Sequence, residues 1–414
     1  MKRYPVYKNS GIEWIGKVPQ DWQVNRLKTV CTFTYGDSLA DEDRIEGGIP
    51  VYGSNGIVGY HNKAITHKPC IIIGRKGSYG KVNFSQTECF PIDTTYFVDD
   101  RSAKCDLKWL SYVLPLLELD KFSKDTGVPG LNREDAHDKR VPIPESEVKK
   151  VITDYLNRKT AQIDDLIAKK ERMIELLKEE RTVIINQAVT KGLNPKAEMK
   201  ESGIEWLGRV PKHWRLKRLK YVVNINPVRP NTISEESKVI FIAMESMSTD
   251  GTYDNSVMRS YLEVKTGFTY FAEDDVIFAK ITPCFENGKG ALLRNLGSAI
   301  GFGSTEFHVL RSVRNETIPE YLYFLTISGL FRRLGEAFMQ GVAGQKRVTN
   351  DFVQNFLIGV PPIDEQEAIS SFLADKIRKI DAQVAREQKS IELLKEYRTS
   401  LISEVVTGKI CLCE

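Results

Sequence analysis

A thirteen-residue segment occurs twice in this chain of 414 residues, and the duplication limits the folds open to it. The first copy, SGIEWIGKVPQDW, covers residues 10–22, and the second, SGIEWLGRVPKHW, covers residues 202–214. Extended to residues 30 and 222, the copies are identical at 13 of 21 positions. Because a repeat of this length indicates a duplicated structural unit, we expect two half-molecules in tandem.

A second repeat supports this organisation. Residues 163–190 align without gaps on residues 380–407, with 14 identities in 28 positions and an unbroken IELLKE in both copies. A weaker similarity joins GVPGLNR at 127–133 to GVAGQKR at 341–347. The predicted order is therefore body, helix, body, helix.

The helical repeats carry apolar residues in a seven-residue cycle, which is typical of coiled coils. Lys170 and Glu387 interrupt the two stripes at matching positions. Since an apolar stripe must be buried, we expect the two helices to pack on each other. The predicted helix-packing residues are Ile163, Ile167, Ile174, Leu177 and Ile184 in the first helix, and Ile380, Val384, Ile391, Leu394 and Leu401 in the second.

The ends of the helices are also predicted. Gly192 and Pro195 should end the first helix, which we expect over residues 148–190. Asp364 and Glu367 have capping-box spacing at the start of the second. We expect four segments: a body at 1–145, a helical region at 146–196, a second body at 197–361 and a second helical region at 362–414.

Short runs of β-forming residues between Gly and Asn turns, such as CIIIG and EFHVL, predict strand-rich bodies. KWLSYVLPLL and PEYLYFLTISGLFRRL predict buried helices late in each body. The fold class is therefore α+β, with two mixed, strand-rich bodies joined by two long helices. Trp14, Trp22, Trp206 and Trp214 are expected to pack the bodies onto the helices.

Composition excludes several classes of protein. The chain has no apolar run of the roughly 20 residues that a membrane helix needs, and no signal-peptide core, so we expect a cytoplasmic protein. Its seven cysteines and five histidines show no zinc-ligand spacing, and we predict no metal site. With a net charge of +4, nucleic-acid binding would require local basic clusters.

The loop GRKGSYGK at 74–81 follows the apolar strand and is the first such cluster. Its glycines allow close approach to a nucleic-acid backbone, and Arg can contact a guanine edge. A glycine-rich turn with solvated lysines is the alternative reading. The candidate DNA-binding residues here are Arg75, Lys76, Ser78, Tyr79 and Lys81.

The second body has a comparable segment, AKITPCFENGKGA, at 279–291, followed by GFGSTEFH at 301–308. Asn reads adenine and Lys reads guanine, although the same residues are ordinary turn formers. The GxG of the later segment leads into a strand, which argues against a cofactor loop. The candidate DNA-binding residues here are Lys280, Thr282, Asn287, Lys289, Ser304 and Thr305.

No active site is evident in the sequence. The loop at 74–81 lacks the GxxxxGK[ST] pattern, and no Asp/Asn-Pro-Pro-aromatic tetrapeptide is present for an adenine methyltransferase. The acidic run Glu273, Asp274 and Asp275 has no second acidic partner with defensible spacing, so a strand-entry turn explains it better than a nuclease site.

Taken together, the paired SGIEW segments, the paired IELLKE helices and the segments YGSNGIVGYHN, GRKGS, PIDTTYFV, FAKITPCFENGKGA and GFGSTEFHVLR resemble the specificity subunit of type I restriction–modification enzymes. The resemblance covers essentially the whole chain. It implies that the bodies are target recognition domains, that the helices form an antiparallel coiled coil, and that the internal repeat has pseudo-twofold symmetry.

The resemblance also implies a non-catalytic DNA-recognition subunit. Each recognition domain would read one half of a split, asymmetric site on double-stranded DNA, and the helices would set the spacer. Two methyltransferase subunits and motor-nuclease subunits would be the partners. S-adenosylmethionine, ATP and Mg²⁺ would belong to those partners, and none to this chain.

Three alternatives stay open at this point. A self-contained methyltransferase or nuclease would need the missing catalytic motifs. A coiled-coil scaffold without nucleic-acid affinity would leave the divergence of the two bodies unexplained. A reader subunit of another split-site modification enzyme would have much the same sequence.

Overall fold

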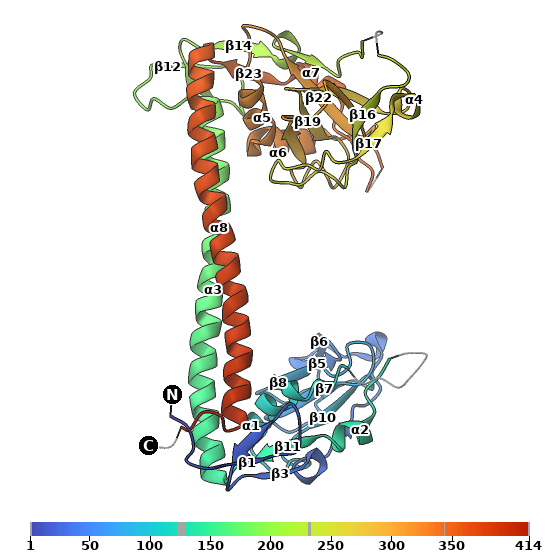
Figure 1. The fold of residues 1–414 in the computed structure, drawn as a ribbon, viewed down its shortest axis with the longest axis vertical. Coiled ribbons are helices and arrows are strands. Elements are labelled where there is room, and N and C mark those ends of the chain that lie inside the picture. The colour runs from blue at the N-terminus through green and yellow to red at the C-terminus, as the bar shows by residue number, and fades with distance from the viewer. Residues whose placement is uncertain (1, 122–128, 231–232, 343, 413–414) are drawn as a thin grey trace. The chain divides into compact units, whose positions relative to one another are not determined.

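The computed structural model describes residues 2–121, 129–230, 233–342 and 344–412, and the chain forms two compact units (Figure 1). Unit 1 contains residues 1–170 and 389–414, and unit 2 contains residues 171–388. Each unit therefore holds one body together with a part of both long helices.

The two long helices are α3 (Ser146–Lys191) and α8 (Ile363–Val406). The expected helix at 148–190 is confirmed, and it ends where Gly192 adopts a φ of +72°. The second helix begins at Ile363, so Asp364 lies inside its first turn instead of preceding it. A carboxylate in that position still favours the helix N-terminus.

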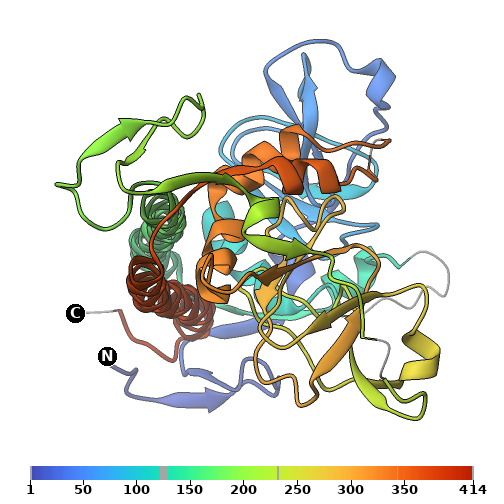
Figure 2. The same cartoon turned by 90° about the horizontal axis from the view of Figure 1, so that it is seen from above.

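Within each unit the α3 and α8 segments lie side by side (Figure 2), and the chain runs along them in opposite directions (Figure 1). In unit 1, Asp164 of α3 pairs with Arg398 of α8. In unit 2, Arg181 of α3 pairs with Asp381 of α8. These are equivalent pairs, because the repeat carries Asp164 onto Asp381 and Arg181 onto Arg398.

Unit 1 contains two small sheets in its body. The first has the order β4-β10-β7-β8, with all neighbours antiparallel. The second has the order β6-β5-β9, with β5 and β9 parallel. The strands are β4 (Thr34–Tyr35), β5 (Ile49–Gly53), β6 (Gly56–His61), β7 (Cys70–Gly74), β8 (Val82–Ser85), β9 (Phe90–Pro91) and β10 (Thr95–Val98).

Unit 2 repeats this plan with one strand more. Its first sheet has the order β15-β22-β19-β20, and its second has the order β17-β16-β21-β18, with β16 and β21 parallel. The strands are β15 (Val223–Ile225), β16 (Lys238–Ile242), β17 (Met258–Ser260), β18 (Thr269–Ala272), β19 (Val276–Ala279), β20 (Gly290–Leu292), β21 (Ile300–Gly303) and β22 (Phe307–Ser312).

The repeated SGIEW segments form the same small structure in both units. A hairpin is followed by a strand that pairs with the last strand of the body, before the long helix. In unit 1 these strands are β1 (Tyr7–Asn9), β2 (Lys17–Pro19), β3 (Gln23–Arg26) and β11 (Arg140–Ile143). In unit 2 they are β12 (Met199–Glu201), β13 (Arg209–Pro211), β14 (Arg215–Arg218) and β23 (Leu357–Val360).

The second tryptophan of each SGIEW segment packs at the end of a long helix. Trp214 is buried, and its ring lies against Gly192 just after α3. Trp22 is also buried and lies against Gly408, just after α8. The segment in unit 1 thus holds the C-terminal end of the second helix, as the segment in unit 2 holds the end of the first. Trp14 and Trp206 are half-buried.

Short helices complete each body, and the two predicted buried helical segments are confirmed. In unit 1 the helices are η1 (Leu27–Thr29), η2 (Asp41–Asp43), α1 (Leu107–Val113), η3 (Leu114–Leu117) and α2 (Arg133–His137). In unit 2 they are η4 (Leu219–Tyr221), α4 (Tyr261–Val264), α5 (Pro319–Ile327), α6 (Gly329–Ala337) and α7 (Asn350–Asn355).

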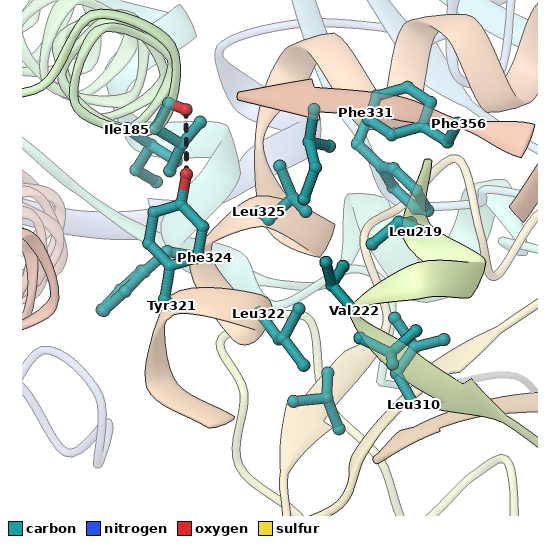
Figure 3. Packing of buried hydrophobic residues seen from close by; sticks show 14 of the residues in the cluster. Ile185, Leu219, Val222, Leu310, Tyr321, Leu322, Phe324, Leu325, Phe331 and Phe356 are labelled. Atoms are coloured by element: carbon teal, nitrogen blue, oxygen red, sulfur yellow. Dashed lines mark hydrogen bonds between the residues drawn. The ribbon is translucent and has the colours of Figure 1, made fainter. Parts of the chain in front are cut away.

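The core of unit 2 shows how a body is joined to the helices. Tyr321 of α5 is fully buried, and its hydroxyl lies 3.2 Å from the carbonyl oxygens of Val189 in α3 and Gly359 in β23 (Figure 3). Ile185 of α3 and Ile369 of α8 belong to the same apolar cluster. The body and both helices therefore share one apolar core, in which burying one large apolar side chain stabilises by about 1.5–3 kcal/mol.

Candidate nucleic-acid interface

In unit 1 the predicted basic loop begins where the buried strand β7 ends. The loop folds back on itself, because Gly80 N donates to Gly74 O at 2.9 Å and Gly74 N donates to Lys81 O at 2.8 Å. A Cβ on Gly74 would lie 2.2 Å from Ser78 O, so only glycine fits there. The turn therefore presents Arg75 and Lys76 just beyond the C-terminal end of β7.

Arg75 lies beside two residues that the sequence reading did not single out. Its guanidinium carbon is 5.6 Å from the ring centre of Tyr35, and the guanidinium carbon of Arg133 is 5.3 Å from the same ring. Tyr35 is half exposed, so the ring supports both arginines at the surface. Arg75 also donates Nε and Nη2 to the carbonyl oxygen of Asp93, at 2.9 and 2.7 Å.

The GVPGLNR segment is the reason Arg133 reaches this place. Gly130 forms an isolated antiparallel β-bridge with Lys76, and Leu131 N donates to Arg75 O at 2.8 Å. Tyr96 donates its hydroxyl to Leu131 O at 3.0 Å, and burial raises the pKa of Tyr96 to about 12. Gly127 and Val128, the first residues of the segment, lie outside the described residues.

Unit 2 has the same arrangement at the end of β19. Val348 N donates to Lys280 O at 2.8 Å, and Lys280 N donates to Glu306 O at 2.8 Å, as Arg75 N donates to Thr94 O in unit 1. His308 stands where Tyr96 stands, with Nε2 at 2.9 Å from Val348 O. Burial lowers the pKa of His308 to about 4. We call this shared set of contacts the loop frame.

The charges around the loop frame differ between the units. In unit 2, Arg347 makes three contacts of 2.8–3.1 Å with the carboxylate of Glu306, and this pairing lowers the pKa of Glu306. Asn226 donates from Nδ2 to Asn350 Oδ1 at 2.9 Å. Unit 2 therefore presents the amides of Asn226 and Asn350 and a neutralised Arg347–Glu306 pair where unit 1 presents arginines on a tyrosine ring.

The other candidate DNA-binding residues are more dispersed. Lys81 Nζ bonds the carbonyl and side-chain oxygens of Asn55, at 2.9 and 2.8 Å, and Lys289 Nζ bonds Met244 O at 2.9 Å. Both amines thus hold neighbouring turns. The remaining candidates are at least partly exposed in the same loops, namely Ser78, Tyr79, Thr282, Asn287, Ser304 and Thr305.

The acidic run of unit 2 has structural partners. Asp275 is fully buried and takes two hydrogen bonds of 2.7 Å from Arg311, which raises the pKa of that guanidinium. Asp274 pairs with Arg294, and Glu273 accepts backbone N–H groups of the 295–296 turn. The three carboxylates therefore stabilise the entry to β19.

The predicted helix-packing residues are withdrawn from solvent to different degrees. Most are buried and a few are half-buried. The buried ones are Ile163, Ile167, Ile174, Leu177, Ile380, Ile391 and Leu401, and the half-buried ones are Ile184, Val384 and Leu394. Ile185, next to Ile184, is more deeply buried and packs into the core of unit 2.

Several apolar side chains of the helices remain exposed. In unit 2, Met173 and Leu176 share one face of α3, three residues apart. In unit 1, Leu393 and Tyr397 share one face of α8, four residues apart. Leu176 and Leu393 are equivalent in the repeat, and 43% and 52% of their surfaces are exposed.

One group of potential metal ligands lies in unit 1. The ligand atoms of His67, Asp99 and Asp100 lie within 4.8 Å of one another. Asp99, however, already pairs with Arg101 and accepts a hydrogen bond from His67 N. Since the arginine neutralises its charge, these contacts account for the group without an ion. None of the helices in the described ranges combines the length and apolar character needed to cross a bilayer.

The duplicated unit, with a polar loop frame at one sheet edge of each body, defines a class of tandem two-domain proteins. A family model described as the type I restriction modification DNA specificity domain matches residues 19–176 and 211–393. The two matches cover most of the chain, one in each half. The chain therefore belongs to the type I restriction–modification specificity family, as the sequence resemblance predicted.

Individual relatives agree with this assignment. The EcoEI specificity subunit of Escherichia coli is 35% identical over 216 residues, which is 50% of this chain and 36% of that protein. The EcoAI specificity subunit of the same species is 38% identical over 200 residues, 47% of this chain and 33% of that protein. The chain thus aligns with about a third of each. The MjaVIII specificity subunit of Methanocaldococcus jannaschii is 24% identical over 95% of this chain and 94% of its own.

Solved structures share the fold. A chain from a structure of complex assembly and conformational transition in the type I R-M system has a TM-score of 0.69 at 13% identity, covering 95% of this chain and 99% of that one. The HsdS subunit from Thermoanaerobacter tengcongensis has a TM-score of 0.51 at 14% identity, covering 95% and 98%. The predicted α+β fold with an internal repeat is confirmed.

Proposed function

We propose that this chain is the DNA-reading subunit of a type I restriction–modification complex and that each body reads one half of a split, asymmetric site. The observation that carries the proposal is the loop frame, which both units share while its polar side chains differ. A common frame with different side chains is what two readers of unlike sequences require.

The long helices would set the gap between the two half-sites. The matched repeat of about 28 residues corresponds to about 42 Å of helix at 1.5 Å per residue. Readers docked on one face of a duplex need about 34–36 Å, one helical turn, between their centres. The two lengths are comparable, which supports a role for the helices as a spacer. On this view the functional segments are 1–145, 146–196, 197–361 and 362–414.

The helices would also dock two methyltransferase subunits. Leu176 and Leu393 support this proposal, because each unit offers one exposed leucine at an equivalent helix position. Two copies of one partner could therefore bind in the same way. Motor-nuclease subunits would join the assembly, and adenosylmethionine, ATP and Mg²⁺ would be bound by the partners. This chain would supply recognition and no catalytic group.

DNA binding by the chain with its methyltransferase subunits tests the proposal. We expect sequence-specific binding whose affinity falls by about 10³–10⁵ between 50 and 200 mM salt, as for proteins with six to ten phosphate contacts. An affinity independent of salt and sequence would contradict the proposal. Methylation of DNA by the purified chain alone would show instead a self-contained enzyme.

A further inference from the structure

The two units place a different side chain at one equivalent position of the loop frame. In unit 1, Leu131 is followed by the helix cap Asn132 and then by Arg133, the first residue of α2. In unit 2, Val348 is followed by the cap Thr349 and then by Asn350, the first residue of α7. Arg133 and Asn350 are therefore equivalent in the structure, whereas the similarity of GVPGLNR to GVAGQKR would place Arg133 opposite Arg347.

The equivalence rests on hydrogen bonds as well as on chain order. Leu131 N and Val348 N each donate 2.8 Å bonds to the first loop carbonyl, Arg75 O and Lys280 O. The carbonyl oxygens of the same two residues are bonded by Tyr96 and by His308 from the neighbouring strand. The first residue of each short helix is thus held in the same relation to its sheet.

In unit 1 this position borders a surface cavity of about 330 Å³. Three cations, from Arg75, Lys76 and Arg133, line it with the ring of Tyr35 and the carboxylates of Glu134 and Asp135. Within the described residues, Arg133 makes one polar contact, from Nε to Glu134 Oε1 at 3.4 Å. The two terminal nitrogens of its planar fork remain available for a bidentate contact.

The mixture of charges favours a base pair over a phosphate. The two carboxylates offset two of the three cationic charges and so weaken the attraction of the cavity for a phosphate. A guanine presents two acceptors, N7 and O6, that match an arginine fork, and the paired cytosine presents an N4 amino donor that suits a carboxylate. The arginines and carboxylates together therefore match the major-groove edge of a G·C pair.

In unit 2 the corresponding side chain is an amide held in one orientation. Asn226 accepts from Val309 N at 2.9 Å and donates to Asn350 Oδ1 at 2.9 Å, so the amide of Asn350 is oriented by a residue that is itself fixed. Asn350 is exposed. An oriented asparagine amide contacts adenine through N6 and N7.

We propose that Arg133, supported by the ring of Tyr35, reads a G·C pair in the half-site of the first body, and that Asn350 reads an A·T pair in the half-site of the second. The inference rests on the proposed function, and it adds the residues and the base pairs that distinguish the two half-sites.

The test uses the chain assembled with its methyltransferase subunits. Once the wild-type motif is known, binding is measured on duplexes in which every base pair of both half-sites is replaced in turn. The variants are Arg133→Ala, which removes every donor that could contact guanine, and Asn350→Asp, which replaces the amide donor by an acceptor. Arg140→Ala and Arg314→Ala are matched controls on exposed arginines outside the loop frame.

We expect the wild type to discriminate at the relevant pair by about tenfold to a hundredfold. Arg133→Ala should reduce discrimination to less than threefold at one G·C pair of the first half-site only. Asn350→Asp should do the same at one A·T pair of the second. The controls should leave the whole pattern unchanged.

Two results would overturn this inference while leaving the proposed function intact. Arg133→Ala could weaken binding equally for all duplexes, which is the behaviour of a phosphate contact. It could also leave discrimination unchanged at every position. A wild-type complex that shows no sequence preference at all would instead contradict the proposed function.

Discussion

Asp164 of α3 accepts two hydrogen bonds from the guanidinium of Arg398 in α8, from Nε at 2.9 Å and from Nη2 at 3.3 Å. The equivalent residues in the repeat are Asp381 and Arg181. In unit 2, Arg181 Nε lies 3.6 Å from Asp381 Oδ1. An Asp–Arg pair therefore joins the antiparallel helices in both units. In unit 1 the Asp belongs to α3 and the Arg to α8, and in unit 2 the Arg belongs to α3 and the Asp to α8.

A double-mutant cycle on Asp164→Ala and Arg398→Ala should give a coupling energy of about 0.5 kcal/mol in urea unfolding, falling with added salt. The value is small because both side chains are partly exposed. Asp165→Ala is the matched control, since Asp165 pairs with Lys169 of its own helix. It should show no coupling to Arg398→Ala, and a coupling as large as that of Asp164 would contradict the assignment.

Leu176→Glu and Leu393→Glu should each remove one methyltransferase subunit from the complex, and the double variant should remove both. A charge at an exposed apolar contact is costly to desolvate in an interface. The mass of the purified assembly reports the stoichiometry. Val228→Glu changes an exposed residue in the body of unit 2 and should leave the mass unchanged. Two bound subunits in the double variant would contradict docking at this position.

Removing one matched heptad should shorten the gap in the DNA site. Deletion of residues 164–170 together with 392–398 removes both partners of the Asp164–Arg398 pair and keeps the seven-residue cycle. Seven residues correspond to about 10 Å of helix, or about three base pairs at 3.4 Å each.

The comparison for this deletion is removal of 164–170 alone, which leaves the facing heptad of α8 without its partner. That variant should be less stable, and its methylated sites should not show a single, shorter spacing between the two half-sites. If the matched deletion still methylated only sites with the original gap, the helices would not set the spacing.

Arg75→Ala and Lys76→Ala should weaken recognition of the first half-site and leave the second unchanged. Arg75 contributes through the Tyr35 ring and through its bonds to Asp93 O, so its loss also loosens the loop. Lys280→Ala, at the equivalent position of unit 2, should have the converse effect. Footprinting on the wild-type site measures both, and equal loss at both half-sites with either change would contradict the assignment of one body to each.

His308 should make the stability of unit 2 depend on pH. Burial lowers its pKa to about 4, so the folded state keeps the ring neutral while the unfolded chain takes up a proton below about pH 6.5. Its contribution is therefore complete above pH 6.5 and is lost as the pH falls toward 4. Lys280 and Glu306, the charged groups nearest to it, act in opposite directions.

Between pH 7.5 and 5 the wild type should lose about 2 kcal/mol of unfolding free energy through this histidine. His308→Gln keeps a donor for Val348 O and cannot titrate. The fall in its unfolding free energy between pH 7.5 and 5 should therefore be smaller than that of the wild type by about 2 kcal/mol. Urea unfolding at the two pH values gives both numbers. Identical pH dependence in the two proteins would show that His308 is protonated equally in both states.

The sequence was sufficient to predict the duplicated plan, because residues of one helix or strand are neighbours in the chain. The seven-residue cycle around Ile163 and Ile380 specified the helices, and the apolar run CIIIG specified the strand that carries the loop. The boundary of the compact units was not visible. It cuts both helices near residues 170 and 388, because each body packs on segments of both.

The loop frame could be predicted only in part. Arg75 and Lys280 were found from their position after a buried strand, but Tyr35 and Arg133 lie far away in the chain and meet Arg75 only through strand pairing. The similarity of GVPGLNR and GVAGQKR was the available signal, since both segments bond to the loop: Leu131 N donates to Arg75 O, and Thr282 N donates to Lys346 O. Lys81 has the same local context as Lys76, yet its amine is bound to Asn55. Charge and loop context alone could not separate the two.

Genome-wide mapping of methylated adenine, in cells that express this chain with a methyltransferase subunit, tests most directly whether each body reads one DNA half-site. We predict a split motif with two unlike halves and one constant gap. An unsplit or palindromic motif, or the absence of methylation with a demonstrably active partner, would contradict the assignment of one DNA half-site to each body.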